Sequence, residues 1–106
     1  MTDLFAELAG LDRLVHEPAR LAILTALSSC QSADFNSLKR LIGLSSGNLS
    51  AHLTKLEEAG LIEVKKQFVH RRPNTLVTIS AQGREAVDAH WRRLADLRAG
   101  TSEWEP

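Results

Sequence analysis

Short and polar side chains occupy one side of segment 46–59, which the spacing of its leucines predicts to be a helix. On a helical wheel of about 100° per residue, Leu49, Leu53 and Leu56 fall together and should face a core. Asparagine can pair with adenine, serine and threonine with several base edges, and alanine with the thymine methyl group. A slim helix face also fits the major groove of DNA, which is about 12 Å wide. The side chains opposite the leucines are Gly47, Asn48, Ser50, Ala51, Thr54 and Lys55, and we predict base contacts from Asn48, Ser50 and Ala51.

The remaining polar positions of this segment fit other contacts with a nucleic acid. Thr54 is a further candidate for a base contact. Ser46 and Lys55 suit contacts with phosphate groups, which position a protein on DNA without specifying its sequence. His52 lies at the flank of the leucine side, where it is either a packed, hydrogen-bonded side chain or another phosphate contact. The alternative for the whole polar side is an ordinary solvated helix surface.

Basic residues gather downstream, in a predicted loop over residues 67–74. Arginine at the tip of a β-hairpin can enter a narrow minor groove, where the negative potential is enhanced, or it can contact phosphates. We expect Arg71 and Arg72 to make these contacts ahead of Lys65 and Lys66, which lie on the preceding strand. The alternative is a solvated basic loop.

The net charge of zero hides an uneven distribution. The chain has 106 residues, with 13 lysines and arginines and 13 aspartates and glutamates. Residues 35–75 contain seven basic and three acidic side chains, a net charge of +4, so the remainder carries −4. A basic region of this kind is the electrostatic signature of a nucleic-acid binder.

The composition excludes several other classes of protein. Cys30 is the single cysteine, which excludes an intramolecular disulfide and argues against a cysteine zinc site, so we expect it to be a small buried residue. No apolar run reaches about 18 residues, so we expect no membrane span. The acidic start Met1–Leu4 lacks a signal segment, and a cytoplasmic location is expected. No nucleophile elbow, phosphate loop or HExxH motif suggests an enzyme, and no cofactor is predicted.

The periodicity of apolar residues predicts the elements that must position these side chains. Before the polar helix we expect a helix from about Leu4 to Val15, interrupted near Gly10, a helix from Pro18 to about Ser29, a loop or short extended piece over Ser28–Ala33, and a helix from Ser37 to Ile42 capped by Asn36 or Ser37. After Gly60 we expect strands over Leu61–Lys66 and Thr75–Ile79, a helix over Ala81–Ala99 capped by Ser80, and a loose tail over residues 100–106.

Two helices joined by the three residues 43–45, with a glycine among them, predict a helix-turn-helix. The expected fold is therefore α+β and mainly α, a winged helix-turn-helix with a two-stranded β-hairpin wing and extra N- and C-terminal helices. We expect a single domain over residues 1–106, with its core in residues 16–80 and dimerisation helices in residues 1–15 and 81–99.

The ordered motifs resemble MarR- and ArsR-type winged-helix transcriptional regulators. Residues 45–62 resemble their recognition helix and first wing strand, and residues 16–24 resemble their first core helix. Arg72–Thr75 and Ser80–Arg84 resemble the wing and the start of the last helix. The resemblance covers about residues 16–84. It implies a dimeric regulator, often a repressor, that binds double-stranded DNA.

Two apolar stripes exceed what a winged-helix core of about 65 residues can cover. Exposed stripes usually mark an interface, so we expect a homodimer that sets two recognition helices about 34 Å apart. The alternative is that both helices pack on their own core. The stripes consist of Leu4, Phe5, Leu8 and Leu11 near the N-terminus, and of Val87, Trp91, Leu94 and Leu97 near the C-terminus.

Metal sensing and protein binding are the competing functions. ArsR-type sensors often use an Asp-x-His pair on the last helix, which Asp88 and His90 resemble, but no downstream His or acidic pair matches. We therefore predict no metal site, and any small-molecule effector would have to bind at the dimer interface. The second functional hypothesis is a winged helix that contacts proteins without binding DNA.

Overall fold

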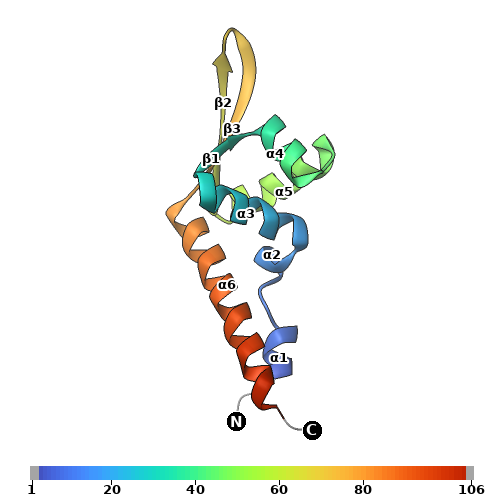
Figure 1. The fold of residues 1–106 in the computed structure, drawn as a ribbon. Coiled ribbons are helices and arrows are strands. Elements are labelled where there is room, and N and C mark those ends of the chain that lie inside the picture. Colours follow the sequence, from blue (N-terminus) through green and yellow to red (C-terminus); the bar gives the residue numbers. More distant parts are fainter. Residues whose placement is uncertain (1–2, 105–106) are drawn as a thin grey trace.

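The chain folds into six α-helices and a small antiparallel sheet in a computed structural model that describes residues 3–104 (Figure 1). The elements are α1 (Leu4–Ala9), α2 (Arg13–His16), α3 (Pro18–Cys30), β1 (Ser32–Asp34), α4 (Phe35–Ile42), α5 (Ser46–Glu58), β2 (Ile62–Val69), β3 (Arg72–Ile79), α6 (Ala81–Gly100) and a 3₁₀ turn η1 (Thr101–Glu103). This order confirms the mainly helical α+β class and the winged helix-turn-helix. No helix among the described residues is long and apolar enough to cross a membrane.

The hydrophobic core lies where α3, α4, α5, the sheet and the first half of α6 meet. Burial of these aliphatic side chains is the main favourable contribution to folding, at about 25 cal/mol per Å² of apolar surface. The largest fully buried side chains are Ile23, Leu24, Leu27, Leu38, Leu49, Leu56, Val77 and Val87.

The helix-turn-helix consists of α4 and α5, each with a side-chain cap. Asp34 caps α4 by accepting a hydrogen bond from the backbone N–H of Ser37 at 2.8 Å. This bond lowers the pKa of the Asp34 carboxyl group. Gly43 ends α4 with a φ of +79°, and the Ser45 hydroxyl accepts the N–H of Asn48 at 3.1 Å to start α5.

The predicted start of α4 was wrong by two residues. The helix begins at Phe35 rather than at Ser37, and Asp34 rather than Asn36 or Ser37 provides the cap. The reason is the short strand β1, which ends at Asp34 and leaves that residue with extended backbone angles suited to a cap. The extended option expected near Ala33 is therefore correct, while α3 continues to Cys30.

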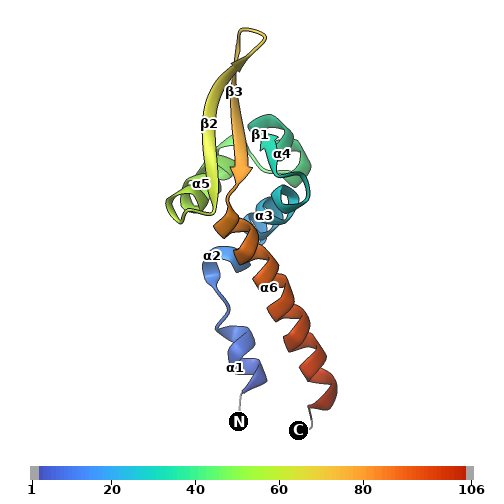
Figure 2. The same cartoon turned by 90° about the vertical axis from the view of Figure 1, so that its left-hand side faces the viewer.

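The sheet has three antiparallel strands in the order β1-β3-β2, so the predicted two-stranded hairpin gains a third strand. Strand β1 pairs with residues 76–78 of β3. The hydroxyl oxygens of Ser32 and Thr78 lie 2.9 Å apart across this pair. From residues 66 and 75 to the turn, the hairpin has no third strand and projects from the fold as a two-stranded ribbon (Figure 2).

The predicted loop over residues 67–74 was wrong, because most of it belongs to the strands. A two-residue turn at His70 and Arg71, with φ values of 52° and 65°, joins Val69 directly to Arg72. Positive φ at both turn residues matches the twist of the flanking strands. Pro73 is tolerated because it follows the hydrogen-bonded pair next to the turn, so its missing N–H removes no bond between the two strands.

Helix α6 is locked to the base of the hairpin. The Ser80 hydroxyl accepts the N–H of Gly83 at 3.0 Å and donates to the carbonyl of Gly60 at 2.6 Å. A Cβ atom at Gly83 would lie 2.0 Å from the Leu61 carbonyl oxygen, so this close approach requires glycine.

The second half of α6 and helix α1 extend away from the core, side by side (Figure 1). The molecule measures 62 × 25 × 21 Å, and its radius of gyration of 16.3 Å exceeds the roughly 13 Å of a compact chain of this size. We call residues 11–90 the body, and residues 3–10 together with 91–104 the arm.

The arm is held together by surface contacts. The rings of Phe5 and Trp104 form a T-shaped pair with centroids 5.2 Å apart, and Glu7 lies 3.6 Å from Arg93. None of the residues Leu4–Ala9 is buried. The loose tail expected after residue 99 was wrong as far as Trp104, because α6 continues through Gly100 into η1 and Trp104 packs on Phe5. The rest of that predicted tail, residues 105–106, lies outside the described residues.

The expected exposure of the apolar stripes was wrong at three positions. Val87 belongs to the core and is fully buried, and Leu97 is also buried, because α6 turns these two side chains toward its own chain. Leu11, between α1 and α2, is buried as well. Leu4 and Leu94 are half-buried. Phe5, Leu8 and Trp91 keep 44%, 44% and 47% of their surface exposed.

A histidine pair marks the junction between body and arm. The Nδ1 atom of His16 lies 3.0 Å from the Nε2 atom of His90, and His90 is buried. Desolvation lowers the pKa of His90, and the positive charge of His16 lowers it further.

Candidate nucleic-acid interface

Helix α5 presents its polar side to solvent, as the leucine spacing predicts. Leu49, Leu53 and Leu56 anchor its other side in the core. The exposed side comprises Ser46, Gly47, Asn48, Ser50, Ala51, Thr54 and Lys55. The structure therefore brings together on one surface seven positions that the sequence suggested, with His52 at their edge.

Two details make this surface slim and partly specify its hydrogen bonding. A Cβ atom at Gly47 would have no described atom within 4 Å, so this position faces open space. The Thr54 hydroxyl donates to the Ser50 carbonyl at 2.9 Å, which occupies its proton within the helix. Thr54 is thus left to offer an acceptor oxygen and a methyl group, whereas Asn48 and Ser50 keep free donors and acceptors.

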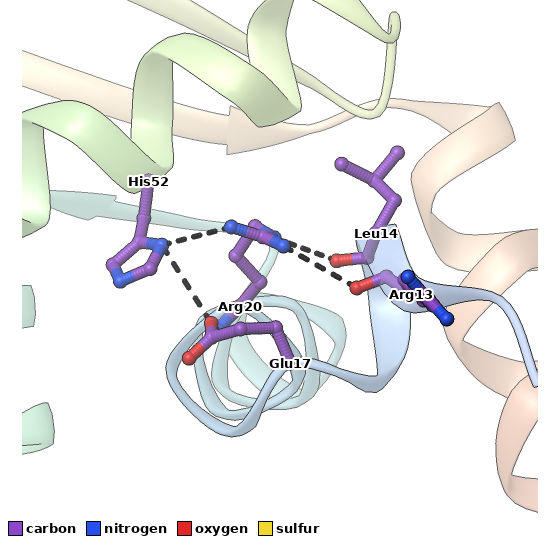
Figure 3. A network of polar contacts seen from close by, with 5 residues as sticks. All are labelled: Arg13, Leu14, Glu17, Arg20 and His52. Atoms are coloured by element: carbon purple, nitrogen blue, oxygen red, sulfur yellow. Dashed lines mark hydrogen bonds and ion pairs between the residues drawn. The ribbon is translucent and has the colours of Figure 1, made fainter.

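His52 is held by a buried arginine that ties α5 to the N-terminal helices (Figure 3). The Arg20 guanidinium donates to the His52 Nδ1 at 3.2 Å and to the backbone carbonyls of Leu14 at 2.7 Å and Arg13 at 3.3 Å. Arginine has no acceptor, so the Nδ1 atom must accept and the proton of a neutral His52 lies on Nε2. The structure thus places His52 in the packed position, with Nε2 as its remaining donor.

Glu17 completes this network. Its carboxylate accepts the N–H of Arg20 at 2.9 Å, which caps α3, and lies 3.6 Å from the His52 Nδ1 (Figure 3). Burial alone would raise the pKa of Glu17, but the backbone hydrogen bonds from Arg20 and Ala19 and the nearby positive charge of Arg20 lower it. The carboxylate, the guanidinium and the imidazole together tie α5 to α2 and α3.

The alternation of β2 places Lys66, not Lys65, on the side of α5. Ile62 is buried, so Val64, Lys66 and Phe68 lie on the same face of the hairpin, and Lys65 lies on the opposite face. A shallow groove between α5 and this face is lined by polar groups that include Ser50, Thr54, Lys66 and Thr75. The sequence analysis named Lys65 and Lys66 together behind the two arginines, and counting in twos from the apolar start of the strand separates them.

The wing tip carries Arg71 and Arg72 on two different sides. Arg71 lies in the turn itself, while Arg72 pairs with Val69 and shares the outer face of the hairpin with Lys65. Both arginines are exposed. Phe68, which the sequence reading did not select, is 76% exposed close to them.

The possible metal and redox positions are separate from this surface. Among residues 3–104 no group of three or more histidine, cysteine, aspartate or glutamate side chains could hold a metal ion. Cys30 is exposed, so its expected burial was wrong, because it ends α3 at the surface with its thiol directed to the Ala26 carbonyl.

Comparisons with known proteins agree with this geometry. The family model described as a winged helix DNA-binding domain matches residues 19–97. The protein MJ0432 of Methanocaldococcus jannaschii is 38% identical over 85 residues, which is 80% of this chain and 92% of that protein.

Solved structures share the fold over nearly the whole chain. A transcriptional regulator homologue from Pyrococcus horikoshii superimposes with a TM-score of 0.84 at 27% identity, covering 94% of this chain and 98% of that one. An ArsR family transcriptional regulator, RHA00566, reaches a TM-score of 0.58 at 24% identity, covering 99% and 100% of the two chains.

Proposed function

This chain belongs to the winged helix DNA-binding domain family of transcriptional regulators, and from that premise we propose that it is a dimeric repressor that recognises a specific double-stranded sequence. The observation that carries the proposal is the slim polar side of α5, which lies beside the basic hairpin with an open groove between them. An ordinary solvated helix surface would not require a basic hairpin and an open groove beside it.

In this proposal α5 enters the major groove. Asn48, Ser50 and Ala51 read base edges, and Thr54 contributes through its methyl group and acceptor oxygen. Ser46 and Lys55 contact phosphates on the two sides of the groove. The Nε2–H edge of His52 is placed to donate to a further phosphate, while its Nδ1 keeps the helix oriented.

The wing contacts the neighbouring backbone and minor groove. Arg71 in the turn reaches furthest, and Arg72 and Lys65 follow the outer face. Lys66 faces the groove beside α5, where a phosphate between the two DNA grooves would lie. These four cations make binding depend steeply on salt, because each phosphate contact releases condensed counterions, and Glu57 is the acidic side chain that shares the groove with Lys66.

A second copy of the chain is expected to cover the arm. Phe5, Leu8 and Trp91 keep nearly half of their surface exposed, and Trp91 is held against α3 by a hydrogen bond from its indole N–H to the Thr25 hydroxyl at 2.9 Å. Trp91 also borders an apolar hollow on α3, lined by residues such as Leu21 and Ala22, which continues this surface along the body. A two-fold pair joined here would set the two α5 helices about one DNA turn, roughly 34 Å, apart.

Selection of binding sites from random duplex DNA with the purified full chain tests the proposal. We expect a palindromic consensus, and an affinity that falls steeply between about 50 and 200 mM salt. Asn48→Ala should relax the preference at one position of each half-site, for a loss of about 1–3 kcal/mol. Failure to enrich any sequence, together with an absence of duplex binding at low salt, would contradict the proposal and favour the protein-binding hypothesis.

The oligomeric state needs its own measurement. Size exclusion with light scattering should give twice the chain mass at micromolar concentration. A monomer under these conditions would contradict the proposed dimer, and the family membership would be unaffected.

A further inference from the structure

Phe68 is a large apolar side chain on the part of the hairpin that projects away from the core. It is the most exposed of the large hydrophobic side chains described, with 76% of its surface open to solvent. It lies six residues beyond the buried Ile62, which corresponds to about 20 Å along the strand. At that distance the core of its own chain cannot cover it.

The ring is one half of an apolar cross-strand pair, which we call the apolar edge. Phe68 is directly opposite Pro73, and both lie on the hairpin face that also carries Lys66 and faces the side of α5. The next pair toward the turn, Val69 and Arg72, points to the other face. Just before its turn, the wing therefore carries a phenyl ring backed by a pyrrolidine ring on the side of α5.

The edge is ordered before any partner binds. The two-residue turn at His70 and Arg71 keeps the strands paired up to Val69 and Arg72, and the ring of Pro73 restricts its own φ. Insertion of a preformed wedge loses little conformational freedom, and preorganisation of this kind favours binding.

The charges around the ring select the class of partner. Between Val64 and Thr75 the chain has four lysines and arginines and no acidic residue, so this end of the molecule attracts polyanions. On DNA, an apolar ring finds apolar surface at the sugar walls of the minor groove and between stacked bases. Proteins that bind the minor groove use such wedges to unstack one base step and kink the duplex by about 20–90°.

We propose that Phe68, backed by Pro73, enters the minor groove and partly unstacks one base step, so that the protein bends its operator. The inference rests on the proposed DNA-binding function and adds a second mode of recognition to it. Pyrimidine–purine steps such as TA and CA unstack most easily, so Phe68 selects these steps without a hydrogen bond to any base.

Fluorescence of 2-aminopurine, placed in turn at each step of the selected operator, tests the wedge. The wild-type full chain should raise the fluorescence at one step per half-site, and energy transfer between dyes at the two duplex ends should report a bend. Phe68→Ala should abolish both signals and weaken binding about tenfold, as expected for loss of one aromatic contact with a base. Replacing a TA step there by GG should weaken wild-type binding and leave the variant unaffected.

Two further variants separate the wedge from a general effect of the wing. Phe68→Leu keeps an apolar side chain and should retain the bend. Val69→Ala removes apolar surface from the opposite face of the hairpin, one residue closer to the turn, and should behave like the wild type. Phe68 and Val69 are both exposed, so none of these changes should shift the melting temperature.

The outcomes distinguish this inference from the function on which it rests. If the wild type selects an operator but gives no 2-aminopurine signal and no bend, the wedge is wrong and the DNA-binding proposal stands. If Phe68→Ala binds and bends DNA like the wild type, the ring serves a contact with another protein instead. If the wild type binds no duplex at all, both proposals fall together.

Discussion

The body and the arm of this molecule are built from the same kinds of residue, yet they are stabilised differently. In the body, leucines, isoleucines and valines from α3, α4, α5, the sheet and α6 are removed completely from water. In the arm, none of the six residues of α1 is buried, and the contacts are an aromatic pair, one exposed ion pair and the single buried side chain of Leu97. The body therefore has a core of its own, whereas the arm leaves the rings of Phe5 and Trp91 about half exposed.

The difference follows from the number of layers. A helix must bury one stripe against another element, and a body with helices on a sheet does so from several directions. The arm has α1 and the end of α6 alone, so its apolar side chains are covered on one side at most. A six-residue helix is also too short to be stable by itself in water.

The largest expected effect is in the body. Leu24→Ala removes a fully buried side chain, and the free energy of unfolding should fall by about 2–5 kcal/mol. The matched change in the arm, Leu8→Ala, starts from a side chain that is nearly half exposed and should change the free energy of unfolding of the dilute chain by less than about 1 kcal/mol. Urea unfolding at low protein concentration measures both, and equal losses would break the comparison.

The next effect separates assembly from folding. Leu8→Glu places a charge on the arm and should yield a monomer by light scattering with an unchanged melting profile of the body. Affinity for a DNA with two half-sites should fall by about 10²-fold or more, because the second contact is no longer intramolecular. Affinity for an isolated half-site should stay the same. Leu8→Met keeps the apolar surface and serves as the control, and a Leu8→Glu variant that remains dimeric would contradict the arm's role.

A smaller effect is confined to the cap of α4 within the body. Asp34→Ala should lower the free energy of unfolding by about 1 kcal/mol, while Asp34→Asn, which keeps a side-chain acceptor, should restore most of it. The pKa of Asp34 is lowered in the folded state, so the carboxylate's contribution is present above its unfolded pKa of about 4 and is lost as the pH falls below it. The difference between wild type and Asp34→Ala should therefore shrink in acid, as pH-dependent denaturation can show.

The smallest effect lies at the junction. Because burial and His16 lower the pKa of His90, the unfolded chain binds a proton at this residue at a pH where the folded chain does not. The free energy of unfolding should be constant above about pH 7 and should decline as the pH falls below the ordinary histidine pKa of about 6.5. His90→Asn should flatten this decline, and His70→Asn, at the exposed turn of the wing, should not. A decline of the same size in both variants would place the titrating group elsewhere.

The body was also the easier region to predict from sequence. The leucines of α5 repeat with helical spacing, and Ser45 and Ser80 are good caps, so the helix-turn-helix and the start of α6 follow from local chemistry. The cap of α4 did not, because Asp34 takes its extended conformation from the pairing of β1 with β3, a contact between distant parts of the chain. Likewise His70-Arg71 lacks the asparagine or glycine of a usual tight hairpin turn, so the full length of the wing was hidden.

The arm shows a different limit. A helical stripe says which side chains share a face, but it does not say which element meets that face, so Val87 in the core and Trp91 at the surface look alike in the sequence. For the wing, by contrast, the sequence is enough to predict which side chains share a face, because alternation from Ile62 assigns Lys66 and Phe68 to one side. The roles of these side chains on DNA remain predictions.

The close contact between Gly83 and the Leu61 carbonyl makes the whole molecule behave as a lever. With no room for adjustment there, α6 and the base of the wing move as one rigid piece. Helix α6 has 20 residues and is therefore about 30 Å long, so a tilt of about 10° moves its far end by roughly 5 Å. That displacement exceeds the rise of one base pair, about 3.4 Å, so in the proposed dimer a slight change of angle between the two copies would take their α5 helices out of register with successive turns of the duplex.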